Sequence, residues 1–230
     1  MDLSSSAGAS LGSVHRTLRE QVEDELRLRI VTGRYAPGER LVEEQVAVDL
    51  GVSRNPVREA LRSLVAQGFV AVVPRRGAVV RRLGRQDVDD LFDVRGSLES
   101  LAARHAAERG GPEVAARLRG LLEEARGASD RHDYDRLAEL NSAFHGEVVA
   151  LSGNALLQQI VHGLAWRTRW LFRRSASTRA PHSWAEHLAL VDAIAAGDPD
   201  RAARLAGEHV EAARASALEA LGESRHRPTA

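Results

Sequence analysis

Residues 51–69 read GVSRNPVREALRSLVAQGF, a pattern that predicts a helix following a tight turn. Ser53 is a favourable N-cap residue, Pro56 is tolerated in the first helical turn, and Gly68 is a stop signal. The apolar positions of this helix are Val57, Leu61, Leu64 and Val65. Its other side carries Arg54, Arg58 and Arg62, so one face is expected to pack while the other is cationic.

The segments on either side extend this pattern into a small domain. Two amphipathic helices are expected before it, one from about Val14 to Thr32 and a short one from Leu41 to Leu50. After it, two β-branched runs, Phe69–Val73 and Ala78–Arg82, flank a turn cluster and predict a two-stranded wing. We therefore expect a winged helix-turn-helix domain over residues 14–83.

The rest of the chain has the pattern of a helical bundle. Helices are expected near 87–109, 112–127, 131–151, 154–177, 183–196 and 199–221. The predicted fold is mainly α, with three helices and a wing followed by an all-helical bundle of about six helices over residues 87–222. Residues 84–86 are expected to form a linker, residues 1–13 a disordered tail, and residues 223–230 a second tail.

Composition limits the possible functions. The 230 residues include no cysteine, which excludes a disulfide scaffold and a thiolate metal site. Hydrophobic residues make up 43% and aromatic residues only 4%, which favours helices over sheets. The N-terminus has neither a basic start nor an apolar run, and no long uncharged apolar stretch follows. We therefore expect a cytoplasmic protein without a membrane partner.

Positive charge is concentrated around the candidate helix-turn-helix. Basic and acidic residues both total 32, yet residues 53–85 hold eight arginines against the single acid Glu59. A major groove accepts such a helix, because arginine reads guanine edges while the helix N-terminus and its hydroxyls meet phosphate. The wing tip, with Arg76 and Gly77, is expected to enter the neighbouring minor groove. For any single arginine, a solvated charged surface is the alternative.

Three motifs point to a known family. They are Pro37-Gly38-Glu39-Arg40-Leu41, Gly51-Val52-Ser53-Arg54-x-Pro56-Val57-Arg58-Glu59-Ala60-Leu61 and Pro74-x-x-Gly77-Ala78-x-Val80. Together they resemble the winged helix-turn-helix of GntR-type bacterial transcription regulators. The resemblance implies that the partner is double-stranded operator DNA. Its expected contacts, including a hydroxyl contact at the helix start, are Ser53, Arg54, Asn55, Arg58, Arg76 and Gly77.

Four residues in the helical part have ligand chemistry. Asn141 and His145 lie one turn apart and so face the same way, while His187 and His209 lie on later helices. Three imidazoles and one oxygen suit Zn²⁺, Ni²⁺ or Mn²⁺ and leave positions open to water or a carboxylate. Spacing alone leaves ordinary buried histidines as the alternative, since the chain has 9 His.

The helical part also carries family motifs. They are Val94-Arg95-x-x-Leu98-Glu99, Asn141-x-x-Phe144-His145, Gly153-Asn154-x-Leu156 and Glu186-His187-x-x-x-Val191. They are similar to the ligand-binding FCD domain of the FadR subgroup. In metal-binding members three His and one Asp hold a divalent cation, and the resemblance maps these ligands onto Asn141, His145, His187 and His209. The neutral amide of Asn141 holds a hard cation less strongly than Asp, but leaves more positive charge for an anionic effector.

Arg95 is the expected effector contact. An Arg one turn before Glu99 resembles the cavity-lining positions of FCD relatives, and its planar guanidinium matches a carboxylate. The alternative is a surface ion pair between Arg95 and Glu99, which would stabilise the helix only weakly.

These features predict a homodimeric transcription regulator rather than an enzyme. Two winged domains would read a pseudo-palindromic operator, and a small organic acid near the metal would change operator affinity, with repression as the expected outcome. One alternative is a metal sensor in which the cation is the effector. Another is a metal-dependent enzyme, which is disfavoured because Glu186 and Glu208 each precede a candidate ligand and would point about 100° away from it on a helix.

Overall fold

The computed structural model describes residues 16–226, apart from the side chains at 180–181 and 223–226. The chain divides into two compact units, with the main boundary between Arg81 and Arg82. The tail expected at residues 1–13 lies outside the described residues. No described helix has the length and apolar character that crossing a membrane requires.

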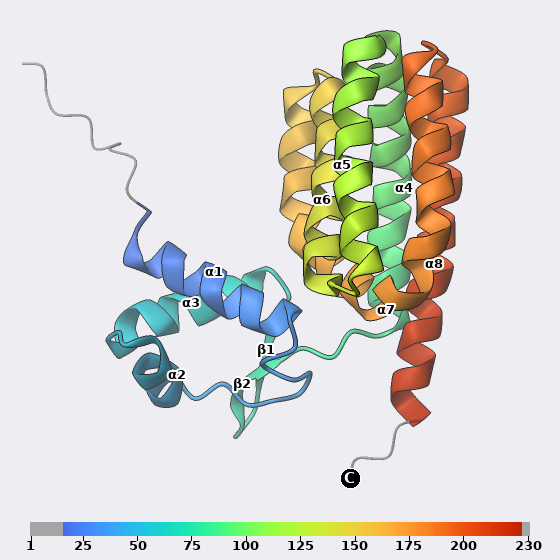
Figure 1. Ribbon diagram of the computed structural model, residues 1–230. Helices are drawn as coiled ribbons and strands as arrows, with labels where there is room; N and C mark the ends of the chain where they lie inside the picture. The colour runs from blue at the N-terminus through green and yellow to red at the C-terminus, as the bar shows by residue number, and fades with distance from the viewer. Residues whose placement is uncertain (1–15, 227–230) are drawn as a thin grey trace, which may run out of the picture. The chain divides into compact units, whose positions relative to one another are not determined.

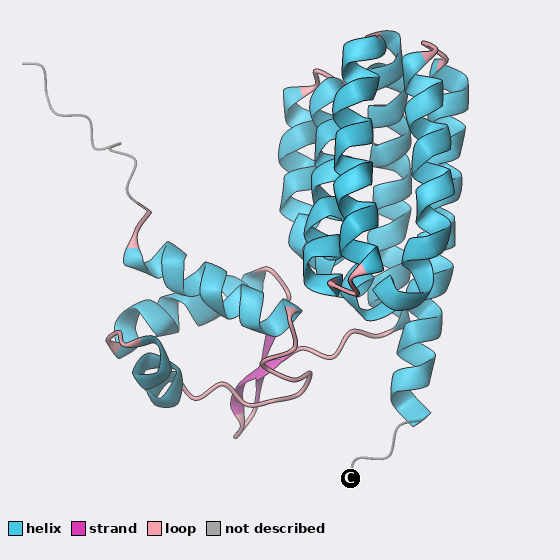
Figure 2. Ribbon diagram, in the orientation of Figure 1, coloured by secondary structure: helices cyan, strands magenta, loops and turns pink. Residues whose placement is uncertain are grey.

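The first unit is a helix-turn-helix with a β-hairpin. Its described elements are α1 (Leu18–Val31), α2 (Glu43–Leu50), α3 (Arg54–Ala66), β1 (Val70–Val73) and β2 (Gly77–Val80) (Figures 1 and 2). The two strands are antiparallel, with Val70 opposite Val80 and Val73 opposite Gly77. This arrangement confirms the predicted winged fold.

Local sequence explains how α3 is placed. Gly51 ends α2 in the left-handed conformation at φ 65°, which suits a residue without a Cβ and makes the tight turn between the helices. Ser53 occupies the N-cap position of α3, but its side chain makes no capping hydrogen bond. The stripe that α3 buries consists of Val57, Ala60, Leu61 and Leu64.

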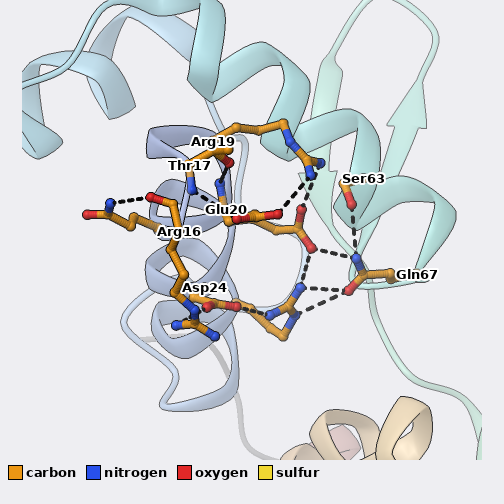
Figure 3. Close-up of polar contacts among 10 residues, drawn as sticks. Arg16, Thr17, Arg19, Glu20, Asp24, Ser63 and Gln67 are labelled. Carbon is orange, nitrogen blue, oxygen red and sulfur yellow. Dashed lines mark hydrogen bonds and ion pairs between the residues drawn. The ribbon is translucent and has the colours of Figure 1, made fainter. Parts of the chain in front are cut away.

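A polar network joins α1 to the end of α3 (Figure 3). The Gln67 side chain, just after α3, donates to Glu23 at 2.6 Å and to Ser63 at 3.0 Å. Its amide oxygen accepts from Arg27 at 2.9 Å, and Arg27 also pairs with Glu23 one turn away on α1. Arg27 and Glu23 are both buried, so these hydrogen bonds fix the register of α1 against α3 at the side remote from the arginine face.

The second unit is a helical bundle. Its described helices are α4 (Arg85–Glu108), α5 (Pro112–Asp130), α6 (Tyr134–Leu151), α7 (Ala155–Ala195) and α8 (Pro199–His226), which lie side by side in Figure 1. Its largest core cluster includes Leu118, Phe144, Val191 and Ile194. The start of α4 at Arg85 makes two of the three expected linker residues helical, and α8 continues past residue 223, where the second tail was expected.

One helix differs from expectation. The segments predicted at 154–177 and 183–196 form a single 41-residue helix, α7, so the bundle has fewer separate helices than expected. A straight helix of this length would extend about 60 Å, but α7 folds back in Figure 1. Phe172 and Trp184, from its two parts, pack against the same cluster around Leu137 and Leu140.

Candidate nucleic-acid interface and metal centre

The exposed side of α3 carries the arginines that the sequence singled out. Arg54, Arg58 and Arg62 follow one another at single-turn intervals and are all exposed, opposite the buried stripe. The Arg54 side chain is 65% exposed and the Arg62 side chain 70%. The α3 helix therefore has one buried apolar face and one solvent-exposed cationic face.

The polar partners of these arginines are local. Arg58 donates to the Asn55 side-chain oxygen at 2.6 Å, which joins two of the predicted DNA contacts. Arg54 lies 4.0 Å from the Glu43 carboxylate of α2, and Arg62 pairs with Glu59 at 3.1 Å. Exposed pairs of this kind are weak, so phosphate oxygens or base edges can replace them at little cost.

The wing presents the other predicted contacts. The Arg76 amide donates to the Val73 carbonyl at 3.0 Å and closes the turn between β1 and β2. Arg75, Arg76 and Gly77 are exposed at its tip. Gly77 has φ 74° and nothing lies within 4 Å of an added Cβ, so backbone conformation rather than space favours glycine there.

Three histidines from three helices meet inside the second unit. His145 of α6, His187 of α7 and His209 of α8 each offer a ring nitrogen, and these atoms all lie within 4.8 Å of one another. The Nε2 atoms of His187 and His209 are 3.3 Å apart. Two nitrogens that bind one tetrahedral ion at about 2.0–2.1 Å are themselves about 3.3–3.4 Å apart. We call these residues the histidine cluster.

Two carboxylates orient the histidine cluster from outside. Glu99 of α4 lies 3.0 Å from His145 Nδ1, and Glu186 of α7 lies 2.7 Å from His209 Nδ1. These contacts turn both Nε2 atoms inward, and the buried His145 Nε2 has no hydrogen-bond partner. Metal-binding histidines commonly have such an outer carboxylate. Sequence reasoning missed both roles, because neither carboxylate is a local neighbour of the histidine that it contacts.

The environment favours the neutral form of His187 and His209. Burial, and then the neighbouring His209 and His145, lower the pKa of His187 well below its ordinary value. Burial followed by the charge of His145 lowers the pKa of His209 in the same way. Neutral imidazole is the form that binds a cation. Burial alone would raise the pKa of Glu99, but Arg95 and His145 lower it below its ordinary value, so this carboxylate stays charged.

Asn141 lies at the edge of the histidine cluster. It is buried one turn before His145 on α6 and lines a cavity of about 10 Å³ with Arg95, Arg179 and His209. A cavity of this size holds about one water molecule. Arg179 pairs there with Glu186, so the Glu186 carboxylate is engaged by a guanidinium as well as by His209.

Arg95 and Glu99 form the ion pair considered as an alternative, but inside the bundle. Arg95 Nε donates to Glu99 Oε1 at 2.7 Å, and their side chains are only 6% and 9% exposed. The Phe92 ring lies 4.9 Å from the guanidinium carbon. The two terminal nitrogens of Arg95 make no hydrogen bond to the described residues. Arg95, Glu99 and His145 also line a cavity of about 520 Å³, which we call the large cavity.

Comparison with protein families accounts for both units. Residues 18–80 match the model for bacterial regulatory proteins of the gntR family, and residues 90–212 match the FCD domain. The chain belongs to the GntR family. A relative from Paenarthrobacter nicotinovorans, described as a probable D-xylose utilization operon transcriptional repressor, is 32% identical over 85% of this chain and 87% of its own. The GntR-family relatives are transcriptional regulators and not enzymes.

Other GntR-family proteins support the same assignment. The repressor GlaR of Escherichia coli K12 is 33% identical over 83% of this chain and 84% of its own length. A GntR-type structure from Rhodococcus sp. RHA1 has a TM-score of 0.76 at 26% identity and covers 87% of this chain and 97% of that one. Escherichia coli McbR/YncC shares the fold, with a TM-score of 0.76 at 24% identity, covering 92% of this chain and 100% of that chain.

The donor set of the second unit fits a divalent cation. The histidine cluster supplies three nitrogen donors at suitable separations, and the buried His145 Nε2 has no hydrogen-bond partner among the described residues. The candidate bases of the enzyme alternative are otherwise engaged. Glu186 contacts His209, and Glu208 pairs at the surface with Arg204 at 3.0 Å.

Proposed function

We propose that this protein is a metabolite-responsive repressor that acts as a homodimer in the cytoplasm. Each winged domain reads half of a pseudo-palindromic operator, and a small carboxylate bound beside a divalent cation in the FCD domain changes operator affinity. The single observation that carries the DNA-binding part is the exposed arginine face of α3, backed by a buried apolar stripe.

The predicted DNA contacts have distinct roles. Arg54 and Arg58 read guanine edges in the major groove, and Asn55 suits adenine. The Ser53 hydroxyl, which makes no capping bond, is available to a phosphate oxygen at the start of α3. Arg76 and Gly77 bring positive charge and a close backbone approach to the neighbouring minor groove.

The effector part rests on Arg95 and its surroundings. Glu99 holds one edge of the guanidinium, and the terminal nitrogens remain for a carboxylate at the wall of the large cavity. Asn141 and the histidine cluster would hold the cation, which supplies further positive charge for an acid at this end of the cavity. The P. nicotinovorans relative is described as a probable transcriptional repressor of a D-xylose utilization operon, which supports control by a metabolite.

Coupling between the two domains requires only differential affinity. An acid that prefers one dimer geometry by about 1–3 kcal/mol would change operator occupancy by roughly 5- to 150-fold. The histidine cluster also supports a second candidate, a metal-sensing regulator in which the cation itself is the effector.

The DNA-binding proposal is tested with the purified full chain and promoter fragments. We expect a chosen fragment to bind about a thousandfold more tightly than shuffled DNA at moderate ionic strength, as measured by fluorescence anisotropy. No preference for any promoter fragment over shuffled competitor would contradict the proposal.

A chelation series separates the two candidate effectors. Operator binding is measured with and without chelator across a range of small carboxylic acids. A metabolite-responsive regulator should respond to an acid when the cation is present. If chelation alone switches operator binding on or off at every acid concentration, the metal-sensing function is correct instead.

A further inference from the structure

The large cavity is lined mainly by uncharged residues, and its charged residues lie next to each other. Its buried end is formed by Arg95, Glu99 and His145, whereas Gln159 and His162, which also line it, are exposed. Arg95 and Glu99 are the only Asp, Glu, Lys or Arg residues lining it in the described part of the chain, and they pair with each other. The apolar part of the wall consists of Leu98, Val149, Val161, Leu164 and Ala165.

We propose that the effector is a monocarboxylate with an uncharged, largely apolar body. This inference rests on the proposed function and specifies the ligand of the same site. The acid lies at the buried end, where the terminal nitrogens of Arg95 take its two oxygens. The Phe92 ring and the bond to Glu99 hold the guanidinium in place, so little ordering is needed when the acid binds.

The rest of the large cavity discriminates against a second charge. A second carboxylate held against Leu98, Val149 and Val161 would lose water, and Arg95 is the only Lys or Arg that lines the cavity in the described part of the chain. Burying an unpaired carboxylate is unfavourable, so a diacid should bind at least about tenfold more weakly than the monoacid of equal length. A polyhydroxy acid is disfavoured for the same reason, because its hydroxyls would lose water along an apolar wall.

The size of the cavity agrees with this assignment. A volume of about 520 Å³ lies within the usual range for small-molecule sites and exceeds what a very short acid needs. Neutral polar groups, Gln158 and Thr168 among them, also line the cavity and allow one hydroxyl or carbonyl on the body. In this proposal, Arg95 at the buried end selects for a carboxylate group, and the apolar wall selects for an uncharged, largely apolar remainder of the ligand.

The test compares three acids of equal chain length. Hexanoate, hexanedioate and gluconate are titrated into the full chain by calorimetry, with and without added Zn²⁺. We expect hexanoate to bind at least about tenfold more tightly than either of the others. Arg95→Gln should abolish hexanoate binding while leaving the circular dichroism spectrum unchanged.

A second experiment tests whether a single substitution can reverse the ligand preference. Gln158→Arg places a cation on the cavity wall and should raise hexanedioate affinity at least about tenfold relative to hexanoate. Ser177→Arg adds the same charge at an exposed position of α7 outside the lining, and should leave the preference unchanged. The proposed role of the apolar wall would be wrong if Gln158→Arg does not favour hexanedioate while Ser177→Arg keeps the ligand preference of the parent chain.

The outcomes separate a failure of the monocarboxylate inference from a failure of the proposed function on which it rests. Tighter binding of hexanedioate or gluconate by the parent chain overturns the monocarboxylate assignment but leaves a carboxylate-responsive repressor. If none of these acids, and no other carboxylate in the chelation series, binds or alters operator affinity, the effector part of the proposed function fails as well.

Discussion

Arg58 is the residue at which sequence discrimination can be measured most directly. It is exposed on α3 and donates only to neighbouring Asn55 among the described residues, so Arg58→Ala removes a DNA-facing guanidinium without opening the core. We expect operator affinity to fall by about 1–3 kcal/mol and discrimination against random DNA to fall with it. Anisotropy titrations on both DNAs measure this change.

The control for Arg58 is a matched arginine elsewhere. Arg126 is 67% exposed on α5, and Arg126→Ala removes the same charge from the chain away from α3. It should leave the operator preference unchanged. Equal losses on operator and random DNA for Arg58→Ala would mean that Arg58 meets phosphate only.

Glu186 provides a second residue-scale prediction. Its contact with His209 Nδ1 orients the imidazole, so Glu186→Gln should weaken divalent-cation binding about 10- to 100-fold while the chain stays folded. Glu208 precedes His209 in sequence but pairs at the surface with Arg204, which makes Glu208→Gln the matched control. Zinc titration against a competing chelator measures both. Equal zinc affinity for the two variants would show that Glu186 has no role in cation binding.

At the scale of elements, the polar network between α1 and α3 determines how firmly α3 is held. Gln67→Ala deletes the amide that both Arg27 and Glu23 contact, and should destabilise this helix pair by about 1–2 kcal/mol. Hydrogen exchange should therefore quicken in α1 and α3 peptides but not in the bundle. Gln45, exposed on α2, gives the control Gln45→Ala. Unchanged exchange in α1 and α3 would contradict this role.

The sequence predicts the type of each secondary-structure element far better than it predicts the contacts between elements. The 3.6-residue periodicity and the glycine signals indicate the helices and the wing, because both depend on local sequence. The continuity of α7 was missed, because both of its parts pack in the bundle through contacts between helices that local sequence does not show. The contacts of Glu99 and Glu186 depend on how α4, α7 and α8 register against one another, which no spacing in the chain encodes.

At the scale of the whole molecule, the family resemblance grouped candidate ligands that their spacing in the sequence alone could not group. It placed His145, His187 and His209 in one ligand set, and the structure brings them together. It also selected Arg95, whose ion pair with Glu99 was foreseeable from a one-turn separation. Burial of that pair beside a cavity was not foreseeable, because it depends on α6 and α7 covering α4.

The proposed homodimer gives a whole-molecule prediction. A pseudo-palindromic operator requires two winged domains related by a two-fold axis. Sedimentation equilibrium should therefore give a mass twice the 25.0 kDa of one chain. Each operator should bind two chains, with half-sites about one helical turn of DNA apart or a multiple of that. A single-chain mass both free and on the operator would contradict the homodimer.

Glu99 divides its two oxygens between two neighbours, Oε1 facing Arg95 and Oε2 facing His145. A ligand that draws on the charge of Arg95 therefore alters the electrostatic balance at an imidazole on another helix. Thermodynamic reciprocity makes this exchange symmetrical: the factor by which an acid strengthens retention of the ion equals the factor by which the ion strengthens retention of the acid. Under the proposed function, one shared carboxylate therefore couples the affinity for the acid to the affinity for the cation.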